Sequence, residues 1–267
     1  MTSLFDEIKA SKEYGVICDE TINRVIYTMT GRYKSDKLTL KAIKSTLREI
    51  SGAFADAKAL KRAEQLIEEM RGGGDERIAR LSAEVLRLHS SSRERETFFG
   101  ELIHDIREAT GFKSVIDIGC GFTPFHLLMI PGWRDIDYLG IDINTAAVAL
   151  LNRFFELIKA KARARAGDVL VSPPEESAGC ALLFKTLPLL EHWEKGAGRR
   201  LVNGLRCPFV AITFPIKSLG GRDVGMKRTY QEYMEREFAG FNTVMYKEYR
   251  NEMGYVLEPR AENTEPR

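Results

Sequence analysis

The sequence predicts an α/β fold, with a mostly parallel sheet covered by helices on both faces, preceded by an all-α region. Short apolar runs alternate with helical stretches from residue 114 onward, and no strand pattern is convincing before residue 110. The 267 residues, 44% of them apolar, suffice for one large domain and a smaller one. We therefore expect an N-terminal helical domain at residues 1–80 and an α/β domain at residues 81–267.

Amphipathic helices account for the first 80 residues. Residues 39–50 and 60–70 both carry apolar side chains at steps of three and four, the spacing of one helix face. The glycines at 72–74 end the second of these helices, and a further helix is expected at 75–88. In the first helix the apolar positions are Leu40, Ile43, Leu47 and Ile50.

Positive charge is concentrated in this N-terminal region. The net charge of the chain is only +2, but residues 24–62 hold ten Lys and Arg against three acids. A clustered basic surface fits a polyanion such as nucleic acid. An ordinary solvated helix face explains the same charges, so composition alone leaves both interpretations open.

The cysteines and the hydropathy of the sequence indicate the cellular compartment in which the protein is expected. The four cysteines (Cys18, Cys120, Cys180 and Cys207) are far apart and form no C-x-x-C pair, so neither a zinc knuckle nor a redox pair is indicated. Isolated cysteines suit a reducing compartment. The N-terminus carries acids and lacks a long apolar run, and no segment reaches the roughly 20 apolar residues of a membrane span. We expect a cytoplasmic, monomeric protein without metal or membrane partner.

The α/β domain is predicted from four short apolar runs and a closing pair of strands. A helix is expected between the second and third strands, at residues 145–159. An antiparallel pair at 241–249 and 252–258, with its turn at 250–251, ends the domain. The four apolar runs are residues 114–119, 138–143, 180–184 and 209–214.

A glycine-rich turn follows the first of these strands in the segment VIDIGCGFTP, residues 115–124. In a doubly wound sheet this turn lies at the ligand-binding crevice, and Gly119 and Gly121 let the backbone approach a ligand closely. A dinucleotide-binding G-x-G-x-x-G motif would need glycine at position 124, which is Pro124 here. Tight binding of a pyrophosphate is therefore not indicated.

Two acids follow the next strands. Asp142 ends the second strand, where a carboxylate accepts hydrogen bonds from a ribose diol, and Asp168 follows Gly167 near the end of the third, where it can accept from an adenine amino group. A turn residue and a helix N-cap are the plainer interpretations of the two acids. Together with D-x-G-x-G they resemble the pattern of class I methyltransferases, which implies a Rossmann-like, seven-stranded sheet and S-adenosyl-L-methionine (SAM) as cofactor.

The segment LHSSSRER, residues 88–95, joins the helical region to the α/β domain. Its serines are explained by helix capping, but its arginines are not. SAM carries a free carboxylate, which a fixed guanidinium binds well. We assign that role to Arg95, with His89 or Ser92 in support.

Four motifs in order, LHSSSRER, DIGCGFTP, LLFKTLPLLE and FPIKSLGGRDVGM, carry a resemblance to a known family. The chain resembles the aminoglycoside-resistance 16S ribosomal RNA methyltransferases, which methylate N7 of guanine 1405 in the decoding site. The resemblance covers nearly the whole chain. It implies that the helical domain docks on 16S rRNA within the small ribosomal subunit, and that methylation confers aminoglycoside resistance.

The resemblance also implies roles for individual residues. Lys185 and the pair Thr123-Pro124 would position the target base, although relatives usually have Asn-Pro where this chain has Thr123-Pro124. Lys12 and Lys44 would contact rRNA from the N-terminal domain. The cofactor pocket would comprise His89, Ser90, Arg95, Gly119, Asp142 and Asp168.

The loop after the fifth strand faces the incoming RNA in this interpretation. Lys217 and Arg222 would bind phosphate, and Met226 would pack on a displaced nucleotide or else serve as an ordinary core methionine. Guanine N7 carries an unprotonated lone pair at neutral pH, so we expect no general base. Catalysis should come from holding N7 in line with the methyl group.

Two other functions remain possible on the sequence alone. The chain could be a SAM-dependent methyltransferase of another RNA nucleotide or of a small molecule, with the helical extension as a lid. It could also be a non-catalytic RNA-binding protein that retains the fold, although Arg95, Asp142 and Asp168 argue against this.

Overall fold

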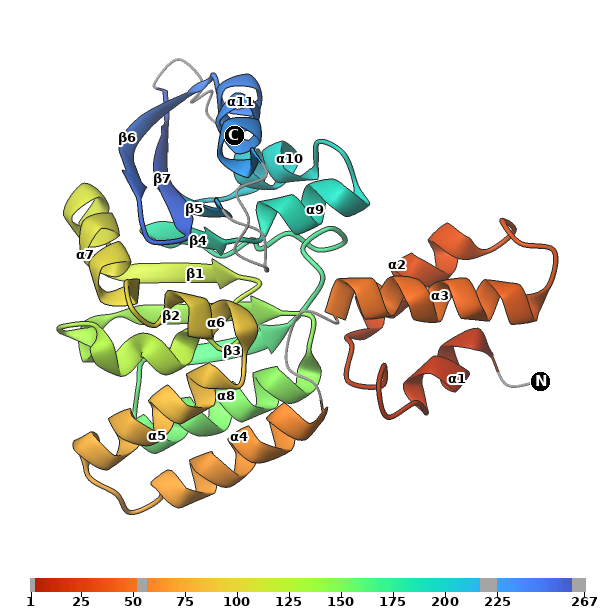
Figure 1. The fold of residues 1–267 in the computed structure, drawn as a ribbon, viewed down its shortest axis with the longest axis horizontal. Coiled ribbons are helices and arrows are strands. Elements are labelled where there is room, and N and C mark those ends of the chain that lie inside the picture. The colour runs from red at the N-terminus through yellow and green to blue at the C-terminus, as the bar shows by residue number, and fades with distance from the viewer. Residues whose placement is uncertain (1–2, 52–56, 217–224, 261–267) are drawn as a thin grey trace.

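The computed structural model describes residues 3–51, 57–216 and 225–260, and it has the predicted α/β architecture (Figure 1). A seven-stranded sheet has the order β3-β2-β1-β4-β5-β7-β6, and β7 is antiparallel to its neighbours β5 and β6. The four predicted apolar runs and the closing hairpin are confirmed to within one or two residues. The strands are β1 Ser114–Ile118, β2 Asp137–Asp142, β3 Ala162–Ala166, β4 Cys180–Phe184, β5 Phe209–Pro215, β6 Phe241–Glu248 and β7 Glu252–Pro259.

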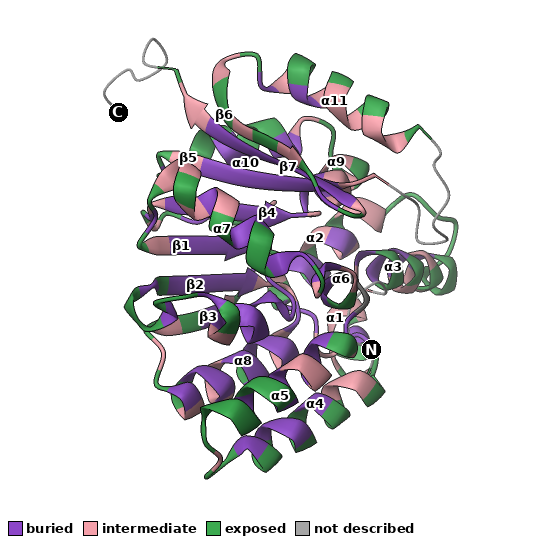
Figure 2. Ribbon diagram, turned by 60° about the vertical axis from the view of Figure 1, so that its left-hand side comes forward, coloured by how far each residue is buried: buried purple, intermediate pink, exposed green. Residues whose placement is uncertain are grey.

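Helices cover both faces of the sheet, because alternate strand residues point to opposite sides. Val115 and Leu182 face a core formed with α4, α5, α7 and α8, while Ile116 and Leu183 face a second core formed with α9, α10 and α11. The central strands are correspondingly almost entirely buried (Figure 2). These helices are α4 Ala57–Met70, α5 Asp75–Arg87, α7 Phe99–Thr110, α8 Thr145–Ile158, α9 Leu187–Trp193, α10 Ala197–Gly204 and α11 Met226–Glu237.

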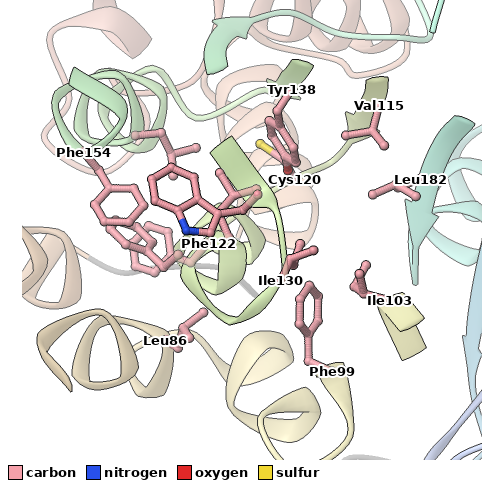
Figure 3. Close-up of a cluster of buried hydrophobic side chains, with 14 of the residues drawn as sticks. Leu86, Phe99, Ile103, Val115, Cys120, Phe122, Ile130, Tyr138, Phe154 and Leu182 are labelled. Carbon is pink, nitrogen blue, oxygen red and sulfur yellow. The ribbon is translucent and has the colours of Figure 1, made fainter. Parts of the chain in front are cut away.

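Aromatic side chains fill the first core beside the glycine-rich turn (Figure 3). Phe122 lies edge-on to Phe125, whose ring centroid is 4.5 Å from that of Phe154 on α8. The 3-10 helix η1, Thr123–Met129, carries Phe125, and a second short one, η2, spans Trp133–Asp135. Because the side chains of Cys120 and Phe122 are both only 1% exposed, they anchor the turn that precedes η1 in the hydrophobic core.

The first three helices form a separate hydrophobic cluster. It comprises α1 Leu4–Lys9, α2 Asp19–Met29 and α3 Asp36–Ser51, and its buried residues run from Ile8 to Ile50. Helices α4 and α5 instead pack into the core of the α/β domain, against α8 and η1. Hydrophobic packing therefore divides the chain after Ile50, and the expected boundary at residue 80 stays a prediction.

Two further findings complete the fold. Helix α6, Ser90–Arg95, links α5 to α7. Among the residues that the structure describes, no helix is both long and apolar enough to cross a membrane.

Candidate active site

The carboxyl ends of the parallel strands point toward α1–α3, and the glycine-rich turn lies at this edge (Figure 1). Gly119 and Gly121 both have positive φ, 69° and 48°, which glycine adopts without strain. A Cβ on Gly119 would lie 3.0 Å from Oγ1 of Thr186, and one on Gly121 would lie 3.2 Å from Nε2 of His89. The turn thus needs glycine for its conformation and also for space.

Asp142 ends β2 beside this turn. Its Oδ2 accepts the backbone N–H of Gly121 at 2.9 Å, and its Oδ1 accepts that of Asn144 at 2.9 Å. Burial raises the pKa of Asp142, and these backbone hydrogen bonds offset only part of that effect. Each carboxylate oxygen keeps a further lone pair, so the side chain can still accept from a ribose hydroxyl as expected.

A cavity of about 90 Å³ brings Gly119, Asp142 and Asp168 together. It opens between the carboxyl ends of the strands, α9 and the N-terminal helices. Three of the six expected cofactor residues therefore share one site. The other lining residues are Arg24, Ile50, Ile118, Ile141, Ile143, Gly167, Val169, Leu170, Thr186, Leu189, Leu190 and Trp193.

Arg95 does not line this cavity but is buried beside the ends of β4 and β7. Its guanidinium is 2% exposed, pairs through Nε with both carboxylate oxygens of Glu252 at 3.1 Å, and lies 5.1 Å from the ring centroid of Phe184. Its Nη2 has no hydrogen-bond partner within the described ranges. A buried guanidinium N–H without a partner is a position that an anionic group of a ligand can fill.

Lys185 follows β4 and belongs to the same charge cluster. It has a left-handed backbone, φ 58°, held by hydrogen bonds from its N–H to the carbonyl and the hydroxyl of Thr213. Its Nζ lies 2.7 Å from Glu94 and 3.3 Å from Glu252. A non-glycine residue in this conformation costs of order 1–3 kcal/mol and is typical of functional sites.

His89 supports the cluster in a neutral form. It is the N-cap of α6, where its Nδ1 accepts the backbone N–H of Ser92 at 3.3 Å. Burial, and then the charges of Arg95 and Lys185, lower the pKa of His89 to about 4. A histidine, not a serine, therefore caps this helix. Ser90 is the first residue of α6, and its side chain is outside the described part.

The expected base-positioning and RNA-binding residues lie in several places. Thr123 and Pro124 are buried in η1, and Thr123 lines a small apolar cavity with Phe99 and Val115, not the charge cluster. Met226 is half-buried and begins α11. Lys217 and Arg222 lie outside the described residues. The roles of all five stay predictions.

The two expected N-terminal cations differ in their surroundings. Lys12 is exposed, in the segment between α1 and α2. Lys44 on α3 pairs with Glu7 at 3.2 Å, so part of its charge is already compensated within the domain. Binding of rRNA by either residue stays a prediction.

Comparison with known proteins decides the family. The sequence pattern of the family described as Ribosomal RNA methyltransferase (FmrO) matches residues 10–244. The chain belongs to this family. This confirms the resemblance seen in the sequence.

Relatives of this ribosomal RNA methyltransferase are similar over nearly their whole length. The 16S rRNA (guanine(1405)-N(7))-methyltransferase of Serratia marcescens is 34% identical over 85% of this chain and 86% of its own. The enzyme of the same name from Frankia casuarinae is 32% identical over 94% of this chain and 91% of its own. The crystal structure of the 16S rRNA methyltransferase RmtF with S-adenosyl-L-homocysteine has a TM-score of 0.86 at 33% identity, covering 96% of this chain and 97% of that one.

Several residues of the charge cluster and of the contacts around Asp168 were not predicted from the sequence of this ribosomal RNA methyltransferase. Glu252 is the first residue of β7 and lies outside the four sequence motifs. Its position directly after the expected turn at 250–251 is the one signal in the sequence that could have indicated it. Glu94 lies inside LHSSSRER, but the capping pattern of that segment does not indicate an ion pair with Lys185. Thr21 and Arg24 bind Asp168 from the N-terminal domain, and no local pattern in the sequence indicates that contact.

Proposed function

We propose that this chain transfers a methyl group from SAM to N7 of guanine 1405 in 16S rRNA of the assembled small ribosomal subunit. The observation that carries the proposal is the buried cluster of Arg95, Glu252 and Lys185, which lies beside a cofactor-type cavity in a member of this family. The names of its relatives supply the target nucleotide. Acting on ribosomes would place the enzyme in the cytoplasm.

The residues present fit SAM. The Nη2 of Arg95, for which the described residues offer no hydrogen-bond partner, suits the methionine carboxylate, since an Arg–carboxylate hydrogen bond is charge-assisted. Asp142 retains lone pairs for the ribose diol, and the glycines at 119 and 121 leave the backbone open to the ligand. When bound, SAM supplies a methyl group already activated on a sulfonium.

Lys185 is proposed to orient the target base. The Hoogsteen edge of guanine presents O6 and N7 as acceptors, and an ammonium that donates to O6 leaves the N7 lone pair free. Glu94 and Glu252 hold the ammonium in place, and the backbone hydrogen bonds to Thr213 fix where the side chain starts. Since N7 is unprotonated at neutral pH, no residue has to remove a proton, and positioning supplies most of the rate.

The N-terminal helices provide a basic surface suited to rRNA phosphates. Arg32, Lys34, Lys37 and Lys41 are all exposed, and none of them has an ion pair within the part of the chain that the structure describes. The exposed rings of Tyr27 and Tyr33 lie in the same stretch, 87% and 44% exposed. Cations with interspersed aromatic side chains bind phosphate and stack on unpaired bases.

The test is methylation of purified small subunits by the purified chain with SAM. We expect N7-methylguanine at position 1405, mapped by primer extension after borohydride reduction and aniline cleavage. Subunits with adenine at position 1405 serve as the control substrate. Modification at another nucleotide, or of protein-free RNA only, would contradict the proposal.

Resistance to aminoglycosides should accompany the activity. N7 methylation adds a methyl group and a positive charge in the drug pocket of the decoding site. Expression in a susceptible bacterium should raise the inhibitory concentration of decoding-site aminoglycosides, and expression of the Lys185→Met variant should not. Resistance with both proteins would argue against methylation as the cause.

A further inference from the structure

Three contacts join the first two turns of α2 to Asp168. The side chains of Thr21 and Arg24 both donate to Oδ2 of Asp168, from Oγ1 at 2.9 Å and from Nε at 2.8 Å. The backbone N–H of Asp168 donates to Glu20 at 2.7 Å. Asp168 is 3% exposed and Thr21 is 0% exposed, so the hydrogen bond between them is almost fully removed from water, whereas the side chain of Arg24 is 21% exposed.

Two backbone hydrogen bonds join the N-terminal domain to the segment that follows Asp142, the other acid of the cavity. The backbone N–H of Cys18 donates to the carbonyl of Ile143 at 2.8 Å, and that of Thr145 donates to the carbonyl of Val16 at 2.7 Å. Ile143 follows Asp142 directly. The segment that leads into α2 therefore pairs with the backbone that carries the ribose-binding candidate.

The N-terminal domain also supplies part of the cavity wall. Arg24 and Ile50 line the cavity together with Asp142 and Asp168. A cofactor that binds in this cavity would therefore contact residues of both domains.

Asp168 has room for one more donor. Its Oδ2 already accepts from Thr21 and Arg24, and its Oδ1 accepts the backbone N–H of Leu170 at 3.0 Å. A carboxylate has about four lone-pair positions, so one remains for the amino group of an adenine. Binding to α2 and binding to the cofactor are thus compatible at the same side chain.

We propose that Thr21 and Arg24 are cofactor-positioning residues, and that α2 couples binding of the cofactor to docking on the small subunit. The coupling rests on the proposed function. Helix α2 holds Asp168 at its first turns and carries the exposed Tyr27 toward its other end. A ligand that fixes the position of this helix at either end reduces its freedom at the other.

The first experiment measures binding of S-adenosyl-L-homocysteine by calorimetry, without RNA. Thr21→Val should weaken binding about 10-fold or more, because loss of a hydrogen bond to a charged group has an effect of that order. Thr21 does not line the cavity, so this loss reports on the position of Asp168 and not on a lost ligand contact. Arg24→Gln should weaken binding as well, and Arg24→Lys should restore part of it.

Arg48→Gln is the matched control, since Arg48 is a cation of the same domain that pairs with the exposed Glu13. It should bind the ligand like the wild type. If Thr21→Val and Arg24→Gln also bind with wild-type affinity, the positioning role is overturned. Because this experiment contains no RNA, its outcome is independent of which nucleotide the enzyme methylates.

The second experiment measures affinity for the small subunit with and without saturating S-adenosyl-L-homocysteine. The ligand should tighten binding of the wild type by a factor in the range of about 5 to 150, the usual range of coupling between sites. In Thr21→Val the factor should fall toward one. Equal affinities for the wild type in the two conditions would overturn the coupling, whereas absence of methylation at position 1405 would overturn only the proposed function.

Discussion

The carboxylate of Glu252 lies 3.1 Å from Nε of Arg95, in an ion pair whose side chains are 0% and 2% exposed. Lys185 reaches the same carboxylate at 3.3 Å. One acid on β7 thus holds the cation proposed for the cofactor and the cation proposed for the target base. Burial alone would raise the pKa of Glu252, but the charges of Arg95 and Lys185 outweigh it and lower that pKa.

Replacement of Glu252 should destabilise the fold strongly. Glu252→Gln leaves the buried guanidinium of Arg95 without a counter-charge, and breaking a buried ion pair costs about 3–5 kcal/mol. Urea denaturation should show this loss in the free energy of unfolding. Glu248→Gln is the control, because Glu248 pairs with Lys227 on the surface, and its loss should cost at most about 1 kcal/mol. Equal effects of the two substitutions would contradict the prediction.

Replacement of Arg95 should weaken binding only of ligands that carry a carboxylate. Arg95→Gln should lower affinity for S-adenosyl-L-homocysteine by about 10- to 150-fold, from the loss of a charged hydrogen bond. Affinity for methylthioadenosine, which has no carboxylate, should stay within about twofold of the wild type. The double variant Arg95→Gln/Glu252→Gln removes both charges and should show the same selectivity if the single variant folds poorly. Parallel losses for both ligands would assign Arg95 a purely structural role.

Replacement of Lys185 should affect the reaction and spare cofactor binding. In Lys185→Met the base loses its orienting donor, and misplacement of a reacting atom by about 1 Å can cost about 100-fold in rate. Single-turnover methylation of small subunits should slow by that order, while calorimetry with S-adenosyl-L-homocysteine should give a nearly wild-type affinity. A variant with lost affinity and an unchanged single-turnover rate would place Lys185 on the cofactor.

Asp117 should make the wild type less stable as pH rises. Burial raises the pKa of Asp117 to about 7, although the hydroxyl of Tyr138 donates to it and favours its charged form. Between the unfolded pKa near 4 and the folded value, only the folded state holds the proton. The contribution of Asp117 to the free energy of unfolding is therefore fully present below about pH 4 and is lost as pH approaches 7.

Asp117→Asn removes this titration. The difference in free energy of unfolding, wild type minus Asp117→Asn, should fall between about pH 4 and pH 7 by up to roughly 4 kcal/mol. Urea denaturation of both proteins across this pH range tests it. A difference that stays flat or rises with pH would show that the carboxyl group of Asp117 is charged in the folded protein.

The sequence predicted the strands well because their apolar runs are short, buried and bounded by turn residues. It also placed Gly119, Asp142 and Asp168 at one edge, since the carboxyl ends of parallel strands meet there. Contacts between distant segments were not predictable in this way. The bond from Thr21 to Asp168 joins residues 147 positions apart, and that from Arg95 to Glu252 joins residues 157 apart. No periodicity in the sequence indicates such pairings, because they form only when the helices and strands fold against one another.

The exposed cations between α2 and the first turn of α3 should contribute more to ribosome binding than Lys44. Arg32, Lys34 and Lys37 have no ion pair within the described ranges, whereas Lys44 pairs with Glu7 and must give up that contact to bind phosphate. Each phosphate contact contributes about 0.7–0.9 to the slope of log affinity against log salt. A variant with all three residues changed to Gln should therefore have a slope shallower by about 2–3, and Lys44→Gln one shallower by less than about 1.

Titration of fluorescently labelled small subunits at several salt concentrations measures both slopes. Binding of S-adenosyl-L-homocysteine should be the same in both variants, which separates lost docking from misfolding. If Lys44→Gln flattened the slope more than the triple variant, the rRNA would instead contact the face of α3 that carries Lys44.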